Sequence, residues 1–137
     1  MAKRIREKSE KIKAVKDTRP YACVRHVRLS PTKAKIVIDT VRGKSYDDAV
    51  AILSNMPQDA AAILLKVVKS AGANAEHNKG MNVHDLKLAE VILGAGPTRV
   101  NKVYFRGRAH GADRIVTRTS HIKVVLDVKE AKNGTKS

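Results

Sequence analysis

Positive charge is concentrated in two parts of this sequence, and that division limits which residues can share a hydrophobic core. Residues 1–28 contain ten Lys or Arg against three Asp or Glu, and residues 99–123 contain seven against one. The stretch between them, residues 29–98, is nearly balanced, with eight basic and seven acidic residues. A charge that served solubility alone would have no reason to cluster in this way. We therefore expect a near-neutral folded body with two basic segments attached to it.

The size of the charge predicts the kind of partner. A net charge of +15 on 137 residues points to a polyanion, either nucleic acid or an anionic membrane surface. The longest apolar run, Ala60 to Leu65, is far shorter than the ~18 residues of a membrane span. The basic N-terminus lacks the apolar core of a signal peptide, and the single cysteine, Cys23, permits no internal disulfide. We expect a cytoplasmic protein that binds no membrane.

Hydrophobic spacing predicts a mixed α+β domain. We expect a strand at Tyr21–Leu29 and then helices that start at Pro31, after a capping box at Ser45–Asp48, and at Pro57. Gly43 and Gly80 suit left-handed helix ends. Strands follow at Leu86–Leu93, Arg99–Phe105 and Ile115–Val128, the last two flanking a glycine-rich basic stretch. Residues 99–121 therefore read as a hairpin that cannot bury itself in its own core, although a basic loop without function is the simpler alternative.

Small residues gather near the end of the third of these helices. Ala71, Gly72, Ala73 and Ala75 indicate that something approaches the helix closely. Tight core packing is the interpretation we favour. The alternative is RNA backbone lying against the helix end, near Asn74, His77 and Asn78.

No catalytic or metal-binding pattern is complete. Cys23 and His26 form half of a zinc signature, and the other half is missing at suitable spacing. We expect Cys23 to be a strand residue that faces the core. Gly94-x-Gly96 lacks the third glycine and the helix of a dinucleotide-binding turn. We therefore predict that the protein is not an enzyme and that it has no catalytic residue, no cofactor and no metal.

Several motifs together resemble one family. Val27–Lys35, Val41–Lys44, Ser70–Asn78, Gly96–Thr98, Ala112–Ile115 and Arg118–Ile122 are similar, in order and spacing, to segments of the ribosomal protein L-twenty-two family in its bacterial form. The resemblance covers about residues 21–127. It implies three helices packed on a small three-stranded antiparallel sheet, with a long protruding β-hairpin arm. Residues 1–19 lie outside the resemblance and read as a basic tail from their charge and the following Pro20, so we divide the chain into a basic tail (1–20), one domain with its hairpin (21–128) and a C-terminal tail (129–137).

The resemblance also implies a function. A member of this family is a structural constituent of the large ribosomal subunit. It binds large-subunit rRNA early in assembly and contacts neighbouring ribosomal proteins. Its hairpin extends to the wall of the polypeptide exit tunnel, near the nascent peptide. No homo-oligomer is expected. The tip here, Arg106, Gly107, Arg108, Ala109, His110 and Gly111, lacks the family's usual proline. The identity of the residue that reaches the tunnel lumen is therefore not carried over.

The expected rRNA contacts combine the basic segments with polar residues of the matching motifs. They are Arg25, Arg28, Ser30, Lys33, Arg42, Lys44, Asn74, His77, Asn78, Arg99, Lys102, Arg106, Arg108, Arg114, Arg118, Thr119, Ser120 and His121. Two other classes of function remain open from the residues alone. One is a free-standing architectural nucleic-acid-binding protein with a β-arm, and the other is an enzyme acting on RNA through Cys23 or a histidine.

Overall fold

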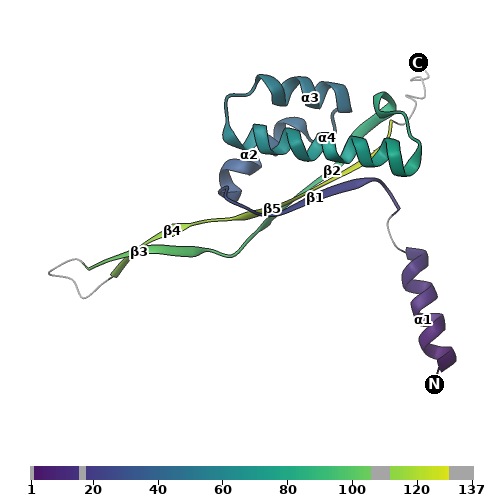
Figure 1. Cartoon of the computed structure of the whole chain (residues 1–137), viewed down its shortest axis with the longest axis horizontal. Coiled ribbons are helices and arrows are strands. Elements are labelled where there is room, and N and C mark those ends of the chain that lie inside the picture. Colours follow the sequence, from purple (N-terminus) through teal and green to yellow (C-terminus); the bar gives the residue numbers. More distant parts are fainter. Residues whose placement is uncertain (1, 16–17, 106–111, 130–137) are drawn as a thin grey trace, which may run out of the picture.

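A computed structural model describes residues 2–15, 18–105 and 112–129 of the chain. Three helices, α2 (Pro31–Val41), α3 (Tyr46–Asn55) and α4 (Asp59–Lys79), lie on one side of a small sheet, and a two-stranded arm extends away from this body (Figure 1). The predicted α+β fold with a protruding hairpin is confirmed. A further helix, α1 (Ala2–Val15), occupies the segment that the sequence predicts to be a basic tail. Its described side chains are almost all exposed, so local helical preference rather than core packing forms it.

The sheet of the body has three antiparallel strands in the order β1 (Tyr21–Val27), β5 (Ser120–Val128) and β2 (Leu86–Ala95). The central strand is thus the last in sequence, and β1 is an edge strand. Ala22 lies opposite Val124, and Val91 lies opposite Val124 on the other side of β5. These side chains point toward the helices because directly opposed residues share a face of the sheet.

Local signals in the sequence account for most helix ends. Pro31 starts α2, although the Ser30 side chain makes no capping bond, and Gly43 follows α2 with a φ of 75°. Gly80 ends α4 with a φ of 60°, as expected of a left-handed cap. At the start of α3 the Ser45 hydroxyl accepts a bond from the Asp48 N–H at 3.3 Å. The Asp48 carboxylate accepts from that hydroxyl at 2.5 Å, instead of from the Ser45 N–H as a full capping box requires.

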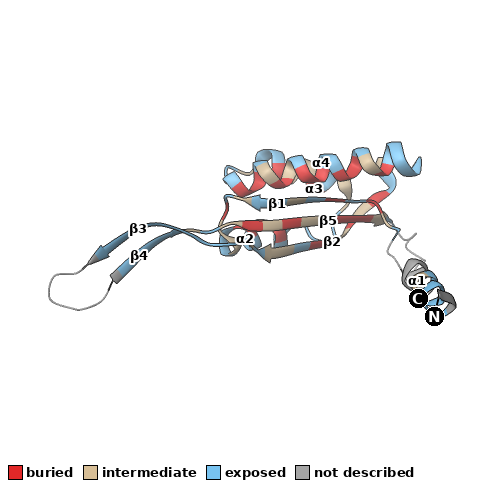
Figure 2. Cartoon of the chain, turned by 60° about the horizontal axis from the view of Figure 1, so that its bottom comes forward, coloured by how far each residue is buried: buried red, intermediate tan, exposed pale blue. Residues whose placement is uncertain are grey.

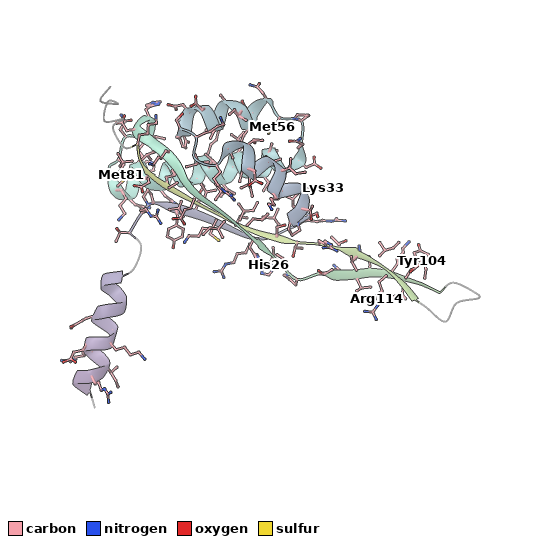
Figure 3. All side chains as sticks on the ribbon, turned by 180° about the vertical axis from the view of Figure 1, so that it is seen from behind. His26, Lys33, Met56, Met81, Tyr104 and Arg114 are labelled. Atoms are coloured by element: carbon pink, nitrogen blue, oxygen red, sulfur yellow. The ribbon has the colours of Figure 1, made fainter. Side chains whose placement is uncertain are left out.

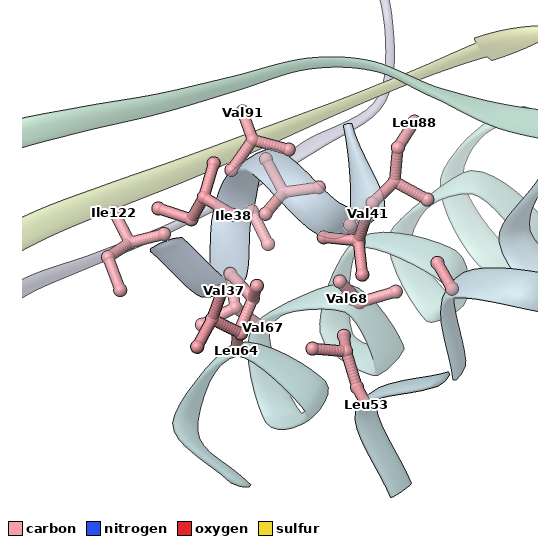
Figure 4. Packing of buried hydrophobic residues seen from close by; sticks show 14 of the residues in the cluster. Val37, Ile38, Val41, Leu53, Leu64, Val67, Val68, Leu88, Val91 and Ile122 are labelled. Atoms are coloured by element: carbon pink, nitrogen blue, oxygen red, sulfur yellow. The ribbon is translucent and has the colours of Figure 1, made fainter. Parts of the chain in front are cut away.

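One hydrophobic core lies between the helices and the sheet (Figure 4). Val37, Ile38 and Val41 of α2 and Leu64 and Val68 of α4 are almost completely buried in it. The sheet contributes the following buried side chains: Ala22, Leu86, Leu88, Val91, Ile122, Val124 and Leu126. Figure 2 shows that the buried residues stop where the arm begins, so the described strands of the arm contribute nothing to this core.

The strands differ from the predicted ones at three places. β2 extends to Ala95, two residues further than expected, and is preceded by a 3-10 turn at Val83–Asp85. The run predicted at Ile115–Val128 is divided into β4 (Ala112–Thr117) and β5, because the chain bends between the arm and the body. β1 ends at Val27 rather than Leu29, after an irregularity that places His26 at a φ of 57°.

Candidate nucleic-acid interface

The arm is an antiparallel ribbon made of β3 (Arg99–Phe105) and β4. Val100 lies opposite Val116 and Tyr104 lies opposite Asp113, with one irregularity between Val100 and Lys102. Seven residues of strand at about 3.3 Å each carry the described part of β3 roughly 23 Å outward. The predicted tip residues, Arg106, Gly107, Arg108, Ala109, His110 and Gly111, lie outside the described residues.

Basic side chains of the arm are presented to solvent. Arg99 and Lys102 of β3, Arg114 of β4 and Arg118 after it are all exposed (Figure 3 labels Arg114). Across residues 99–105 and 112–118 the only carboxylate is that of Asp113, and its side chain is exposed as well. Water screens such charges unless a partner excludes it, so the arm carries positive potential that the protein itself does not neutralise.

The arm also exposes apolar side chains, which the sequence reasoning underestimated. Val100, Val103, Tyr104 and Ile115 are each between 44% and 51% exposed, and Val116 is 38% exposed. A two-stranded ribbon has no second layer against which to bury such groups. The register places Val100, Val103 and Val116 on one face of the ribbon and Tyr104 and Ile115 on the other, so both faces present exposed apolar groups that a binding partner could cover.

The root of the arm is tightly packed. The Gly96 N–H donates to the Thr119 carbonyl at 2.8 Å, and the Thr119 hydroxyl donates to the Pro97 carbonyl at 2.7 Å. A Cβ at position 96 would lie only 3.2 Å from backbone atoms of Thr119 and closer still to its hydroxyl. Glycine suits position 96 because the two segments of the chain at the root of the arm pass too close together to leave room for a side chain.

Two predicted contact residues at this root are engaged within the protein. Ser120 is completely buried, and its hydroxyl donates to the Leu29 carbonyl. The prediction that its side chain contacts RNA is therefore wrong, because the register of β5 points it inward. The Nδ1 atom of His121 accepts a bond from the His26 N–H at 3.0 Å, and the two rings meet edge to face. That bond holds the unusual backbone conformation of His26 in place.

The predicted basic residues of the body do not form a single cluster. Arg25 and Arg28 lie at the end of β1, next to the arm, and Lys33 lies on the first turn of α2. Arg42 and Lys44 follow the other end of α2, about 14 Å further along its axis. All five are exposed, but Arg42 also pairs with Asp39 at 3.3 Å and donates to the Val91 carbonyl at 3.2 Å.

The small residues of α4 pack against the protein itself. Ala71 and Ala75 are completely buried, and a Cβ on Gly72 would lie 2.7 Å from the Tyr46 hydroxyl oxygen. The core-packing interpretation of this segment is therefore correct. Burial, together with the charges of Asp47 and Glu76, raises the pKa of Tyr46 above 10.0. The Asn74 amide donates to the Tyr21 carbonyl at 3.0 Å, while His77 and Asn78 are exposed.

Cys23 differs from the prediction. It is exposed rather than directed toward the core, because strand alternation gives the core side to Ala22 and its neighbour Val24. Among the described residues, no group of three His, Cys, Asp or Glu side chains is arranged to hold a metal ion. Within the same part of the chain, no helix is long and apolar enough to cross a membrane.

Two comparisons with known proteins agree with this geometry. The family model described as ribosomal protein L22p/L17e matches residues 22–127, which comprise the body and the arm. A protein of Clostridium novyi (strain NT), named large ribosomal subunit protein uL22, is 46% identical over 106 residues. That alignment covers 77% of this chain and 93% of the relative. The fold, the basic arm and both matches lead to one conclusion: the chain belongs to the ribosomal protein L22p/L17e family.

Proposed function

We propose that this chain is a structural, non-catalytic protein of the large ribosomal subunit and that it binds large-subunit rRNA through its body and its arm. Membership of the family and the name of the Clostridium relative support the ribosomal assignment. The observation that carries the rRNA assignment is the arm, whose described residues expose four cations, carry apolar side chains on both faces and contribute nothing to the core.

The side chains that the arm exposes are better matched to contact with folded RNA than to exposure to water. Its guanidinium groups can each bind two phosphate oxygens, and phosphates buried inside folded RNA need such neutralisation. The exposed apolar groups, such as Val103 and Ile115, would lose water when RNA closes around the ribbon. Sequence-independent contacts of this kind position the protein, while the shape of the RNA provides the specificity.

The direction of the arm supports the finer part of the proposal. The described ribbon, β3 up to Phe105 and β4 from Ala112, extends away from the body (Figure 1). Residues 106–111 join these two strands in the sequence and are the part that would reach the wall of the polypeptide exit tunnel and the nascent peptide. The body would stay at the subunit surface in the cytoplasm, among neighbouring ribosomal proteins, and would support early assembly of the rRNA. Tail residues 1–20 and 129–137 flank this single domain.

The proposed rRNA contacts are the predicted residues that remain free of internal roles. They are Arg25, Arg28, Lys33, Lys44, His77, Asn78, Arg99, Lys102, Arg114 and Arg118. Arg106 and Arg108 lie outside the described residues and are proposed as contacts from the sequence alone. Ser30, Arg42, Asn74, Thr119 and His121 are partly exposed or already hydrogen-bonded and would contribute secondary contacts.

The salt dependence of rRNA binding tests the proposal. Each phosphate contact contributes about 0.7–0.9 to the slope of log affinity against log salt, so four arm cations contribute about 3. We expect the variant Arg99→Gln, Lys102→Gln, Arg114→Gln, Arg118→Gln to lose a slope of that size on large-subunit rRNA. The variant Lys35→Gln, Lys69→Gln removes two charges from exposed lysines of α2 and α4, and its change in slope per removed charge should be far smaller than that of the arm variant. An unchanged slope in the arm variant would contradict the proposal.

A comparison of binding to large-subunit rRNA and to duplex DNA distinguishes the proposed ribosomal function from the remaining alternative. The wild-type protein should sediment with large ribosomal subunits and should prefer their rRNA to duplex DNA of equal length. Equal affinity for the two nucleic acids would instead support a free-standing architectural nucleic-acid-binding protein with a β-arm.

A further inference from the structure

A groove of about 780 Å³ runs between α4 and the edge strand β1, on the body and away from the arm. One wall is a row of side chains spaced four residues apart on α4, namely Lys66, Ser70, Asn74 and Asn78, with Lys79 beside the last of them. The other wall is β1 from Tyr21 to Val24, together with residues 18–20 that precede it.

The groove is preformed. The Asn74 amide crosses it to donate to the Tyr21 carbonyl at 3.0 Å, which fixes the helix against the strand. Val67 and Ala22 are buried beneath it, so its floor belongs to the core. Binding of a ligand in this groove would therefore involve little loss of conformational entropy in the groove walls.

The lining favours an anion. Lys66 and Lys79 are exposed, and no Asp or Glu is among the described residues that line the groove. Arg19, which also lines it, is paired with Glu90 at 2.8 Å and is therefore not counted as a free cation. Ser70 and Asn78 lie between the two lysines and supply hydrogen-bond donors that suit phosphate or ribose oxygens.

The dimensions favour a single strand. Lys66 and Lys79 are thirteen residues apart on one helix, which places them about 20 Å apart along its axis. That distance spans several phosphates of one strand. The volume is in the range of clefts that enclose a drug-sized molecule, which matches the thickness of one strand better than that of a double helix.

We propose that the groove between α4 and β1 is a second rRNA subsite, which holds the sugar–phosphate backbone of one unpaired RNA strand between Lys66 and Lys79. This inference rests on the proposed rRNA-binding function and adds a site to it. An extended peptide added to the edge of β1 is the other kind of occupant that such a groove admits. The cationic lining favours RNA because it attracts a polyanion and repels a basic peptide segment.

The test uses the full-length chain and large-subunit rRNA. The variant Lys66→Gln, Lys79→Gln should lower the salt slope by about 1.4 and weaken binding roughly tenfold at 0.15 M salt. The variant Lys35→Gln, Lys69→Gln removes the same charge from exposed positions outside the groove and should change both quantities far less. Circular dichroism and thermal unfolding establish that both variants fold.

The outcomes separate this inference from the proposed function. If the wild-type protein binds rRNA without salt dependence, the proposed function fails. If it binds as expected and the two lysine variants behave alike, only the groove inference fails. A photo-crosslinker attached to Cys23, the only cysteine and a residue of the groove wall, should label RNA in the assembled subunit. Labelling of a ribosomal protein instead would overturn the proposal in favour of a bound peptide.

Discussion

Replacement of Gly72 by alanine should destabilise the body, although alanine is the better helix former. In an exposed helix interior this change gains about 0.5–1 kcal/mol. At position 72, however, the new Cβ would lie 2.7 Å from the Tyr46 hydroxyl oxygen, 2.8 Å from Cε2 and 2.9 Å from Cζ. Side-chain carbons essentially never approach other atoms this closely, so α3 and α4 must separate or the ring must move.

Either response has a cost that exceeds the gain. Overpacking of a core contact costs about 1–3 kcal/mol. Rotating the half-buried ring into solvent instead forfeits part of the roughly 1.5–3 kcal/mol that burial of a large side chain contributes. Subtracting a gain of about 0.5–1 kcal/mol from an overpacking cost of about 1–3 kcal/mol leaves roughly 0–2.5 kcal/mol, and its middle value predicts that Gly72→Ala lowers the free energy of unfolding by about 1 kcal/mol. For a domain of this size the Tm should fall by roughly 2–8 °C.

Urea and thermal unfolding measure the effect, and a second background isolates its cause. In a Tyr46→Leu protein the three ring atoms are absent, so Gly72→Ala should there be stabilising by about 0.5–1 kcal/mol. Ala73→Gly, at the exposed neighbouring position, gives the helix-propensity change alone. A stabilising effect of Gly72→Ala in the wild-type background, or the same sign in both backgrounds, would refute the packing argument. Affinity for rRNA should follow the folded fraction only, because Gly72 faces the protein and not a ligand.

Two further predictions concern the arm and Tyr46. Deletion of residues 104–113 should leave the cooperative thermal transition of the body in place, because none of the described arm residues belongs to the core. Loss of that transition would show that the arm is part of the folding unit. Because the folded protein holds the Tyr46 proton above the ordinary pKa of 10.0, the unfolded chain releases it first as the pH rises. The free energy of unfolding should therefore have its full value below about pH 10 and fall above it, and the fall should be smaller in Tyr46→Phe when denaturation curves are compared across that range.

The sequence was most informative where a local signal agreed with the period of the hydrophobic pattern. Pro31, Gly43 and Gly80 marked helix ends that the structure confirms, and α4 begins at Asp59, two residues after the predicted start at Pro57. The segment Arg99–Phe105 was predicted with its observed bounds. Such signals act within a few residues of themselves, so no knowledge of the rest of the fold is needed to interpret them.

The sequence was least informative about single residues next to irregular backbone. Ser120 looked like a polar contact residue of the arm, but the register of β5 buries it against Leu29. Cys23 looked like a core residue, but the alternation of β1 turns it outward. Strand periodicity has only two phases, and a shift of one residue reverses every side chain. Composition alone does not choose between the phases.

The sequence by itself determined that the protein has two parts with different roles, a folded body and a basic hairpin. Charge clustering separated a near-neutral body from a basic hairpin, because a core cannot form from residues 99–121, and the matching motifs pointed to the family. Only the tertiary structure decided which polar groups remain free. Asn74, Ser120 and His121 are bound within the protein, whereas Lys66 and Lys79 line an open groove. The reason is that the availability of a side chain depends on what packs beside it, and those neighbours, α4 against β1 and β5 against β1, are distant in sequence.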